Sequence, residues 1–298
     1  MYSRPFHYHR AKSLAEASAL LAQLGEGARV LAGGQSLIPL MKLRLASPTH
    51  LVDLNFIPKL SYVEKDSKTI RLGAMTSHTD IESSAVAQEI PILKDCAAGI
   101  ADVQVRNQGT LGGSLAEADP SGDWGPVLLT LSTQVRAVGP QGERTIQLSD
   151  FFVDAYTTSL GPGELVREVV VEIPPKNSGG AYLAFKRCAP VYATASVAVQ
   201  LTLDDKNICR EARMALGCVG LTAIRPGEAE RALQGQTINR TSIEAAAEAA
   251  RAAADPQPDM RGSAELKREL VGVLLRRAIV IAVRRARGER VEGGHIYA

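Results

Sequence analysis

The apolar residues of the first segment recur every three or four positions, which is the period of an α-helix. They are Leu14, Ala17, Leu20, Leu21 and Leu24. Ser13 and Glu16 have the spacing of a capping box, so we expect the helix to begin there and to end at Gly25. An apolar run at 28–32 then predicts a strand, and residues 36–45 predict a second helix. The pattern therefore predicts a strand–turn–helix unit.

Further along the chain, short apolar runs alternate with segments of helical period. We expect strands at 51–53, 61–63, 69–72, 134–139, 145–148 and 165–173, and helices at 77–83, 90–101 and 124–131. Residues 104–123 follow neither pattern and are expected to form a loop. The polar stretch 176–180 has the composition of a linker. Beyond it we expect strands at 181–186, 195–203 and 208–216, then helices from Pro226 onward, chiefly 241–254 and 264–287.

Composition and charge exclude several classes of protein. A chain of 298 residues that is 45% hydrophobic can bury a proper core, in two or more units. A formal net charge of +2 gives no overall attraction to nucleic acid or membrane, and 4% aromatic residues argue against a base-stacking surface. No apolar run is long enough to cross a bilayer and the N-terminus has no secretory pattern, so we expect a cytoplasmic protein.

The side chains that most often carry chemistry form no catalytic or metal-binding pattern. There is no Cys-x-x-Cys pair, so neither an iron–sulfur cluster nor a structural zinc is indicated. Cys188, Cys209 and Cys218 lie in strand-like contexts and are expected to be buried free thiols. Histidines show no metal-ligand spacing, and Ser114 has no evident His and Asp partners. Such a chain fits a protein whose chemistry is carried by a redox cofactor.

Two glycine-rich loops stand out, at residues 32–36 (Ala-Gly-Gly-Gln-Ser) and 110–114 (Thr-Leu-Gly-Gly-Ser). Adjacent glycines permit positive φ and close approach, and free amides in such a turn favour a phosphate. Asp119 and Asp123 follow the second loop, where a carboxylate could accept hydrogen bonds from ribose. A single Gly-Gly-Ser turn is more often a plain bend. The presence of two such loops favours a site in which both loops clamp one diphosphate. The Rossmann and P-loop fingerprints are both absent.

Residues 30–41 and 110–123 resemble the two FAD-binding segments of the medium subunit of molybdenum hydroxylases, a family that includes the FAD subunit of carbon monoxide dehydrogenase and the FAD domain of xanthine dehydrogenase. The resemblance runs from Phe6 to the C-terminal helix. It implies an α+β fold class, with a vanillyl-alcohol-oxidase (PCMH)-type FAD-binding domain at 1–176 made of two α+β subdomains at about 1–57 and 58–176. A C-terminal α+β domain, a three-stranded sheet with helices, would occupy 177–298.

The same resemblance implies which residues bind the cofactor. The two loops would hold the diphosphate with backbone N–H groups and hydroxyls, and Asp123 would serve the adenosine half. Ile100 would line the site, Lys186 would lie near the FAD, and Tyr192 near the isoalloxazine ring, unless Tyr192 is a core residue. Many relatives have His in place of Gln35. The full set is Ala32, Gly33, Gly34, Gln35, Ser36, Leu37, Ile100, Thr110, Leu111, Gly112, Gly113, Ser114, Asp123, Lys186 and Tyr192.

The function implied by the resemblance is electron transfer within a larger enzyme. A large subunit would carry the molybdenum cofactor and a small subunit two [2Fe–2S] clusters, in a dimer of heterotrimers. This chain would pass electrons from the clusters through FAD to an external acceptor. Two alternatives stay open at this point: a stand-alone FAD oxidase, and a non-catalytic nucleotide-binding or scaffolding protein that has kept the loops.

Overall fold

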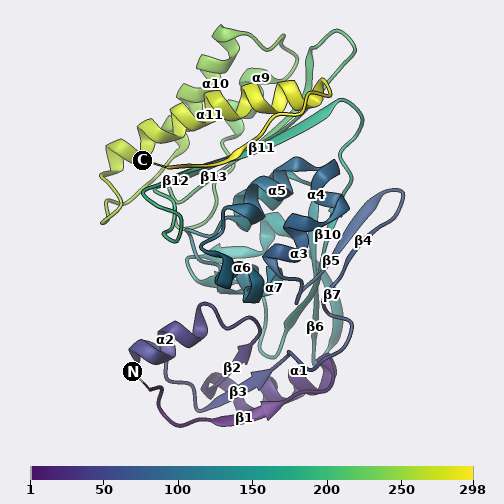
Figure 1. Cartoon of the computed structure of the whole chain (residues 1–298), viewed down its shortest axis with the longest axis vertical. Helices are drawn as coiled ribbons and strands as arrows, with labels where there is room; N and C mark the ends of the chain where they lie inside the picture. The colour runs from purple at the N-terminus through teal and green to yellow at the C-terminus, as the bar shows by residue number, and fades with distance from the viewer. Residues whose placement is uncertain (1, 298) are drawn as a thin grey trace.

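The computed structural model describes residues 2–297 and stacks three sheets along the long axis of the molecule (Figure 1). The first sheet is small and parallel, with strand order β1-β3-β2. Its strands are β1 (His7–Arg10), β2 (Ala28–Leu31) and β3 (His50–Asp53). Helix α1 (Leu14–Leu24) packs on it, with Ser13 accepting a hydrogen bond from the Glu16 amide as predicted. Helix α2 (Leu37–Leu43) follows the first glycine loop.

The second sheet is antiparallel and five-stranded, in the order β4-β5-β10-β6-β7. Its strands are β4 (Val63–Lys65), β5 (Thr69–Gly73), β6 (Thr133–Gly139), β7 (Gly142–Gln147) and β10 (Leu165–Glu172), with a small ribbon of β8 (Phe152–Asp154) and β9 (Thr157–Thr158) beside it. Short helices pack against this sheet and share one apolar core with it. They are α3 (His78–Ser83), α4 (Ala85–Glu89), α5 (Pro91–Ala98), α7 (Leu111–Glu117) and α8 (Trp124–Thr130). Helix α6 (Val103–Gln108) lies against α3 and buries none of its own residues.

The expected loop at 104–123 is largely helical, which corrects the sequence analysis. Asp102 accepts a hydrogen bond from the Val105 amide and starts α6, and Thr110 does the same for α7 through the Gly113 amide. An oxygen-bearing side chain that satisfies a free amide three residues on is the usual start of a helix. Within this stretch, residues 109–110 and 118–123 lie outside the helices.

The third sheet has the order β13-β12-β11-β14. The three expected strands are β11 (Ser178–Lys186), β12 (Ala195–Leu203) and β13 (Cys209–Gly217), while β14 (Gly294–Tyr297) is a fourth strand that the sequence did not indicate. It runs parallel to β11. Helices α9 (Gly227–Leu233), α10 (Arg240–Ala253) and α11 (Ala264–Ala286) pack with the sheet in a second core. Tyr182 and Ala184 of β11 instead join the core of the second sheet, so both faces are covered.

A buried ion pair ties the third sheet to the helices of the second. Arg285 of α11 and Asp95 of α5 form two hydrogen bonds of 2.5 and 3.0 Å, and both side chains are almost fully buried. Arg285 also donates to the Gly180 carbonyl, and Asp95 accepts from the Tyr182 amide. The pair therefore occupies the part of the β11 edge that β14 leaves unpaired.

Two features of individual residues complete the fold. Cys96, Cys209 and Cys218 are buried thiols, but Cys188 is exposed, so its expected burial is wrong. Cys188 lies in the bend between β11 and β12 rather than within a strand. In the described part of the chain no helix is both long and apolar enough to cross a membrane.

Candidate functional site

The first glycine loop connects β2 to α2 and leaves its amides free. Gly34 has φ of 71°, the left-handed conformation that favours glycine. The Asn55 side chain donates to the Ala32 carbonyl (3.0 Å), and the exposed Gln35 side chain donates back to the Gly33 carbonyl (3.0 Å). Within residues 2–297 no acceptor lies in hydrogen-bonding range of the amides of residues 33–37. Successive unbonded amides are what an anion requires.

The second glycine loop differs, because its glycines form the first turn of α7. The Leu111 amide donates to the Thr76 carbonyl (3.0 Å) and the Gly112 amide to the Ala74 carbonyl (2.8 Å). The Gly113 amide donates to the Thr110 hydroxyl (3.1 Å), and the Ser114 amide to the Thr110 carbonyl (3.0 Å). The amides of residues 111–114 are thus all bonded within the protein.

The two loops lie against each other, although more than seventy positions separate them in the sequence. A Cβ added at Gly33 would overlap the Gln108 carbonyl oxygen, and one added at Gly113 would lie 3.8 Å from the Ala32 Cβ. A Cβ at Gly112 would lie 2.6 Å from the Ala74 Cβ. The φ values of Gly33, Gly112 and Gly113 are not positive, so the expectation that these positions require glycine for a positive φ is wrong. These glycines are needed because backbone segments approach one another closely.

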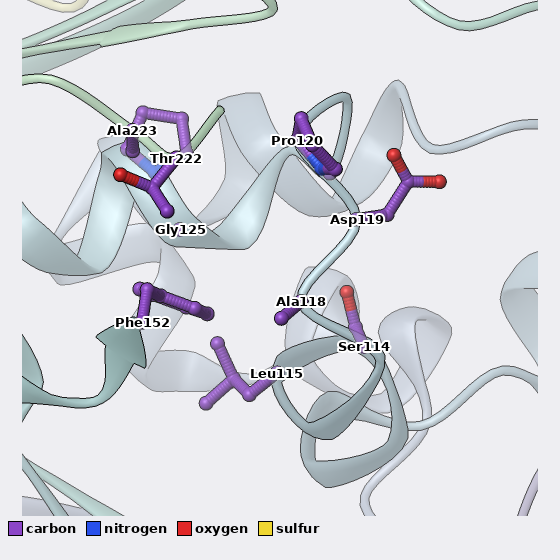
Figure 2. A pocket seen from close by; sticks show the side chains of 11 residues that line it. Ser114, Leu115, Ala118, Asp119, Pro120, Gly125, Phe152, Thr222 and Ala223 are labelled. Carbon is purple, nitrogen blue, oxygen red and sulfur yellow. The ribbon is translucent and has the colours of Figure 1, made fainter. Parts of the chain in front are cut away.

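A small pocket lies beside the second loop (Figure 2). Ser114, Leu115 and Ala118 of the loop and α7 line one side, while Phe152 and Thr222 line another. Its volume of about 20 Å³ has room for a water molecule. Asp119 and Gly122 also line it, so the pocket joins the second loop to the segment that leads to Asp123.

Asp123 and Lys186 form a buried polar cluster where the second and third sheets meet. The Lys186 ammonium donates to the Gly99 carbonyl (2.7 Å), next to Ile100. Asp123 Oδ1 accepts from the Tyr182 hydroxyl (2.6 Å) and lies 3.2 Å from His295 Nε2. Burial acts to raise the pKa of Asp123, but the hydrogen bond from His295 and the charge of Lys186 outweigh it and lower that pKa. Asp123 is therefore a buried carboxylate held in its charged form.

Tyr192 lies apart from this cluster, on the surface near Asp119. Its side chain is about half exposed (51%), so the alternative of a core tyrosine is wrong. The Arg261 guanidinium lies 6.0 Å from the centre of its ring. Partial burial and the charge of Asp119 raise the pKa of the Tyr192 hydroxyl. Asp119 also lines the pocket beside Ser114, so Tyr192 borders the same region of the surface.

Three residues of the site escaped the sequence analysis. Tyr182 and His295 hold Asp123, and His78 supports the second loop by donating its amide to the Gly109 carbonyl (3.3 Å) and accepting from the Trp124 indole (3.0 Å). Burial lowers the pKa of His78 to about 4. No sequence pattern pointed to His295, because its partners Asp123 and Tyr182 lie more than a hundred positions away in the sequence. Across the described residues, no group of three or more His, Cys, Asp or Glu side chains is placed to hold a metal ion.

Comparisons with known proteins match this architecture along nearly the whole chain. Residues 4–175 match the family described as the FAD binding domain in molybdopterin dehydrogenase, and residues 180–282 match the CO dehydrogenase flavoprotein C-terminal domain. The carbon monoxide dehydrogenase medium chain of Afipia carboxidovorans is 41% identical over 95% of this chain and 98% of its own length. The 6-hydroxypseudooxynicotine dehydrogenase complex subunit alpha of Paenarthrobacter nicotinovorans is 40% identical, with coverage of 97% and 98%.

Solved structures agree with the sequence matches. Carbon monoxide dehydrogenase from Hydrogenophaga pseudoflava superposes with a TM-score of 0.93 at 40% identity, covering 96% of this chain and 99% of that one. Quinoline 2-oxidoreductase from Pseudomonas putida gives 0.90 at 33% identity, with coverage of 96% and 99%. The expected fold class is confirmed, and so are an FAD-binding domain and an oxidoreductase family. The chain therefore belongs to the FAD-binding medium subunits of the molybdenum hydroxylases, the family that its two glycine loops indicated.

Proposed function

We propose that this chain is the electron-transfer subunit of a heterotrimeric molybdenum hydroxylase. It would receive electrons from two [2Fe–2S] clusters on a small partner subunit and pass them through FAD to an external acceptor. A large subunit would carry the molybdenum cofactor, and two heterotrimers would form a dimer. Relatives named as a medium chain and a subunit alpha of complexes support this arrangement.

The observation that carries the proposal is the row of unbonded amides at residues 33–37, set against the second loop. In the proposal these amides and the Ser36 hydroxyl bind the diphosphate of FAD from one side, and the Ser114 hydroxyl binds it from the other. Gly33 and Gly113 let the loops meet, while Thr110, Leu111 and Gly112 fix α7 in place. Bound FAD supplies the redox chemistry, and the chain binds and orients it.

The remaining cofactor residues would act along the junction between the second and third sheets. Asp123 is charged and could accept hydrogen bonds from ribose hydroxyls. Lys186 adds a buried positive charge near Ile100, and Tyr192 would border the isoalloxazine end on the surface. A stand-alone oxidase is the second candidate, but the subunit names of the relatives favour the first.

The test of FAD binding uses one alanine at the meeting point of the loops. Gly33→Ala places a methyl group on the Gln108 carbonyl, so the loops must separate. We expect the wild-type chain to be yellow, with about one FAD released per chain, and Gly33→Ala to lose most of it. The matched control is Gly227→Ala, whose new Cβ would lie 3.6 Å from Arg231 Nη1, an ordinary contact far from both loops in the sequence. Full flavin content in Gly33→Ala would contradict the clamp.

The test of the electron route requires the partners. Co-expression with candidate large and small subunits should yield a complex in which substrate reduces first the clusters and then the flavin. Flavin reduction by substrate in the isolated chain would favour the stand-alone oxidase. A folded, colourless chain that takes up no FAD would favour the scaffolding alternative.

A further inference from the structure

The C-terminal strand β14 covers the polar residues that the proposed cofactor site needs. It pairs with the last four residues of β11, so that Lys186 lies opposite Tyr297 and Ala184 opposite His295. Beneath it the Asp123 side chain is only 8% exposed and Lys186 only 1%. Both charged groups are therefore almost fully enclosed, and His295 of β14 is one of the side chains in contact with Asp123.

The His295 side chain fills the space between Gly99 and Asp123. Its ring is 3% exposed and lies edge-on to the Tyr182 ring, with centroids 5.7 Å apart. It also lies directly on Gly99, where an added Cβ would overlap the ring. The ring also lies 3.2 Å from Asp123, so it occupies a position between Gly99 and Asp123 that a polar group of a ligand could fill.

The segment before the strand is anchored at Val291, whose carbonyl accepts two hydrogen bonds from Arg285 (3.0 and 2.7 Å), so a movement of β14 would begin beyond this residue. β14 is at the edge of its sheet, has only four residues and pairs with β11 alone in that sheet. Two glycines precede His295: Gly293 and Gly294, the latter with φ of 114°. Glycines at these points can absorb a large change in backbone direction.

We propose that β14 is a strap that closes the cofactor site in the FAD-free chain and swings away when FAD binds. The inference rests on the proposed function, in which Asp123 and Lys186 belong to the FAD site. In the closed state His295 adds to the Tyr182 hydroxyl and the Lys186 charge in stabilising the buried Asp123 carboxylate. FAD binding replaces that contact with its own hydroxyl groups and releases the strap.

The direct test is amide hydrogen exchange of the full wild-type chain with and without FAD. The amides of residues 294–297 are expected to exchange faster after FAD is added, while those of β11 and β12 stay protected. Slower or unchanged exchange at 294–297 would overturn the proposal, since β14 would then form a wall of the occupied site. If the wild-type chain takes up no FAD at all, the proposed function fails instead, so the two failures are distinguishable.

A kinetic test uses substitutions that weaken the contact between His295 and Gly99. Gly99→Ala is compatible with the backbone of Gly99 (φ −95°, ψ −5°) but removes the seat of the His295 ring. Association of FAD with the flavin-free protein should be at least about tenfold faster if the open form is a tenth or less of the population. His295→Ala should act in the same direction, and Gly227→Ala should bind at the wild-type rate. Unchanged rates in both strap variants, or loss of FAD from both, would overturn the proposal.

Discussion

The buried histidine beneath the second loop should make the fold sensitive to mild acid. His78 opens α3, its side chain is 4% exposed, and its Nδ1 accepts a hydrogen bond from the Trp124 indole (3.0 Å). Burial lowers its pKa from 6.5 to about 4, so the folded chain keeps the ring neutral at pH values where the unfolded chain protonates it.

The size and sign of the effect follow from this difference. A pKa lower by about 2.5 units corresponds to about 3 kcal/mol of folding free energy, at about 1.4 kcal/mol per unit. The unfolded state binds the extra proton between pH 6.5 and about 4, so stability rises with pH across that window. The full contribution is present above pH 6.5 and is lost progressively as the pH falls toward 4.

The assay is urea unfolding at neutral pH and at about pH 4.5, for wild type and His78→Asn. The Asn side-chain oxygen can still accept from the Trp124 indole, but it does not titrate. We expect the wild type to lose about 2–3 kcal/mol more than His78→Asn between the two pH values. The difference between the proteins isolates His78 from the other titrating groups. Equal losses in both proteins would refute the reasoning.

Three further predictions test other contacts. Glu168→Gln should lower the free energy of unfolding by about 2 kcal/mol, because the fully buried Glu168 carboxylate accepts hydrogen bonds from Arg71 and Arg136. Urea titration measures this change, and an unchanged free energy of unfolding would show that solvent can replace the carboxylate as the partner of both arginines. Thr110→Ala should cost about 1 kcal/mol by removing the cap of α7; Thr110→Ser, which keeps the hydroxyl, should cost less, and equal losses would argue against the cap. Cys188 alone should react quickly with a thiol reagent in the native chain, because the other three cysteines are buried and burial raises their pKa values; two or more fast thiols would contradict the packing.

Features that depend on residues close in the sequence were predicted correctly, while features that depend on contacts between residues far apart in the sequence were missed. Helix α1 followed from its apolar period and from Ser13, both local signals. The two glycine loops were found by composition, but the reason for Gly33 and Gly112 lies in backbone atoms of Gln108 and Ala74, which no local pattern shows.

The same limit applied to other parts of the candidate site. The caps Asp102 and Thr110 were readable signals that the irregular composition of 104–123 obscured. The strand containing His295 could not be inferred, because four residues form β14 only where β11 offers an open edge. Whole-chain resemblance supplied Asp123 and Lys186 as candidates, and only the folded structure shows that they share one buried cluster.

The ion pair of Asp95 and Arg285 has a consequence for how the chain behaves in a crowded solution. An unpaired strand edge invites pairing with another molecule and is a common start of aggregation. Here a carboxylate and a guanidinium hold the Tyr182 amide and the Gly180 carbonyl, so that half of the β11 edge offers no partner to an incoming strand. The other part of this edge, the four β11 residues that pair with β14, would be exposed only if β14 moved away after FAD binding. Four residues are too few to nucleate a stable sheet with a second molecule.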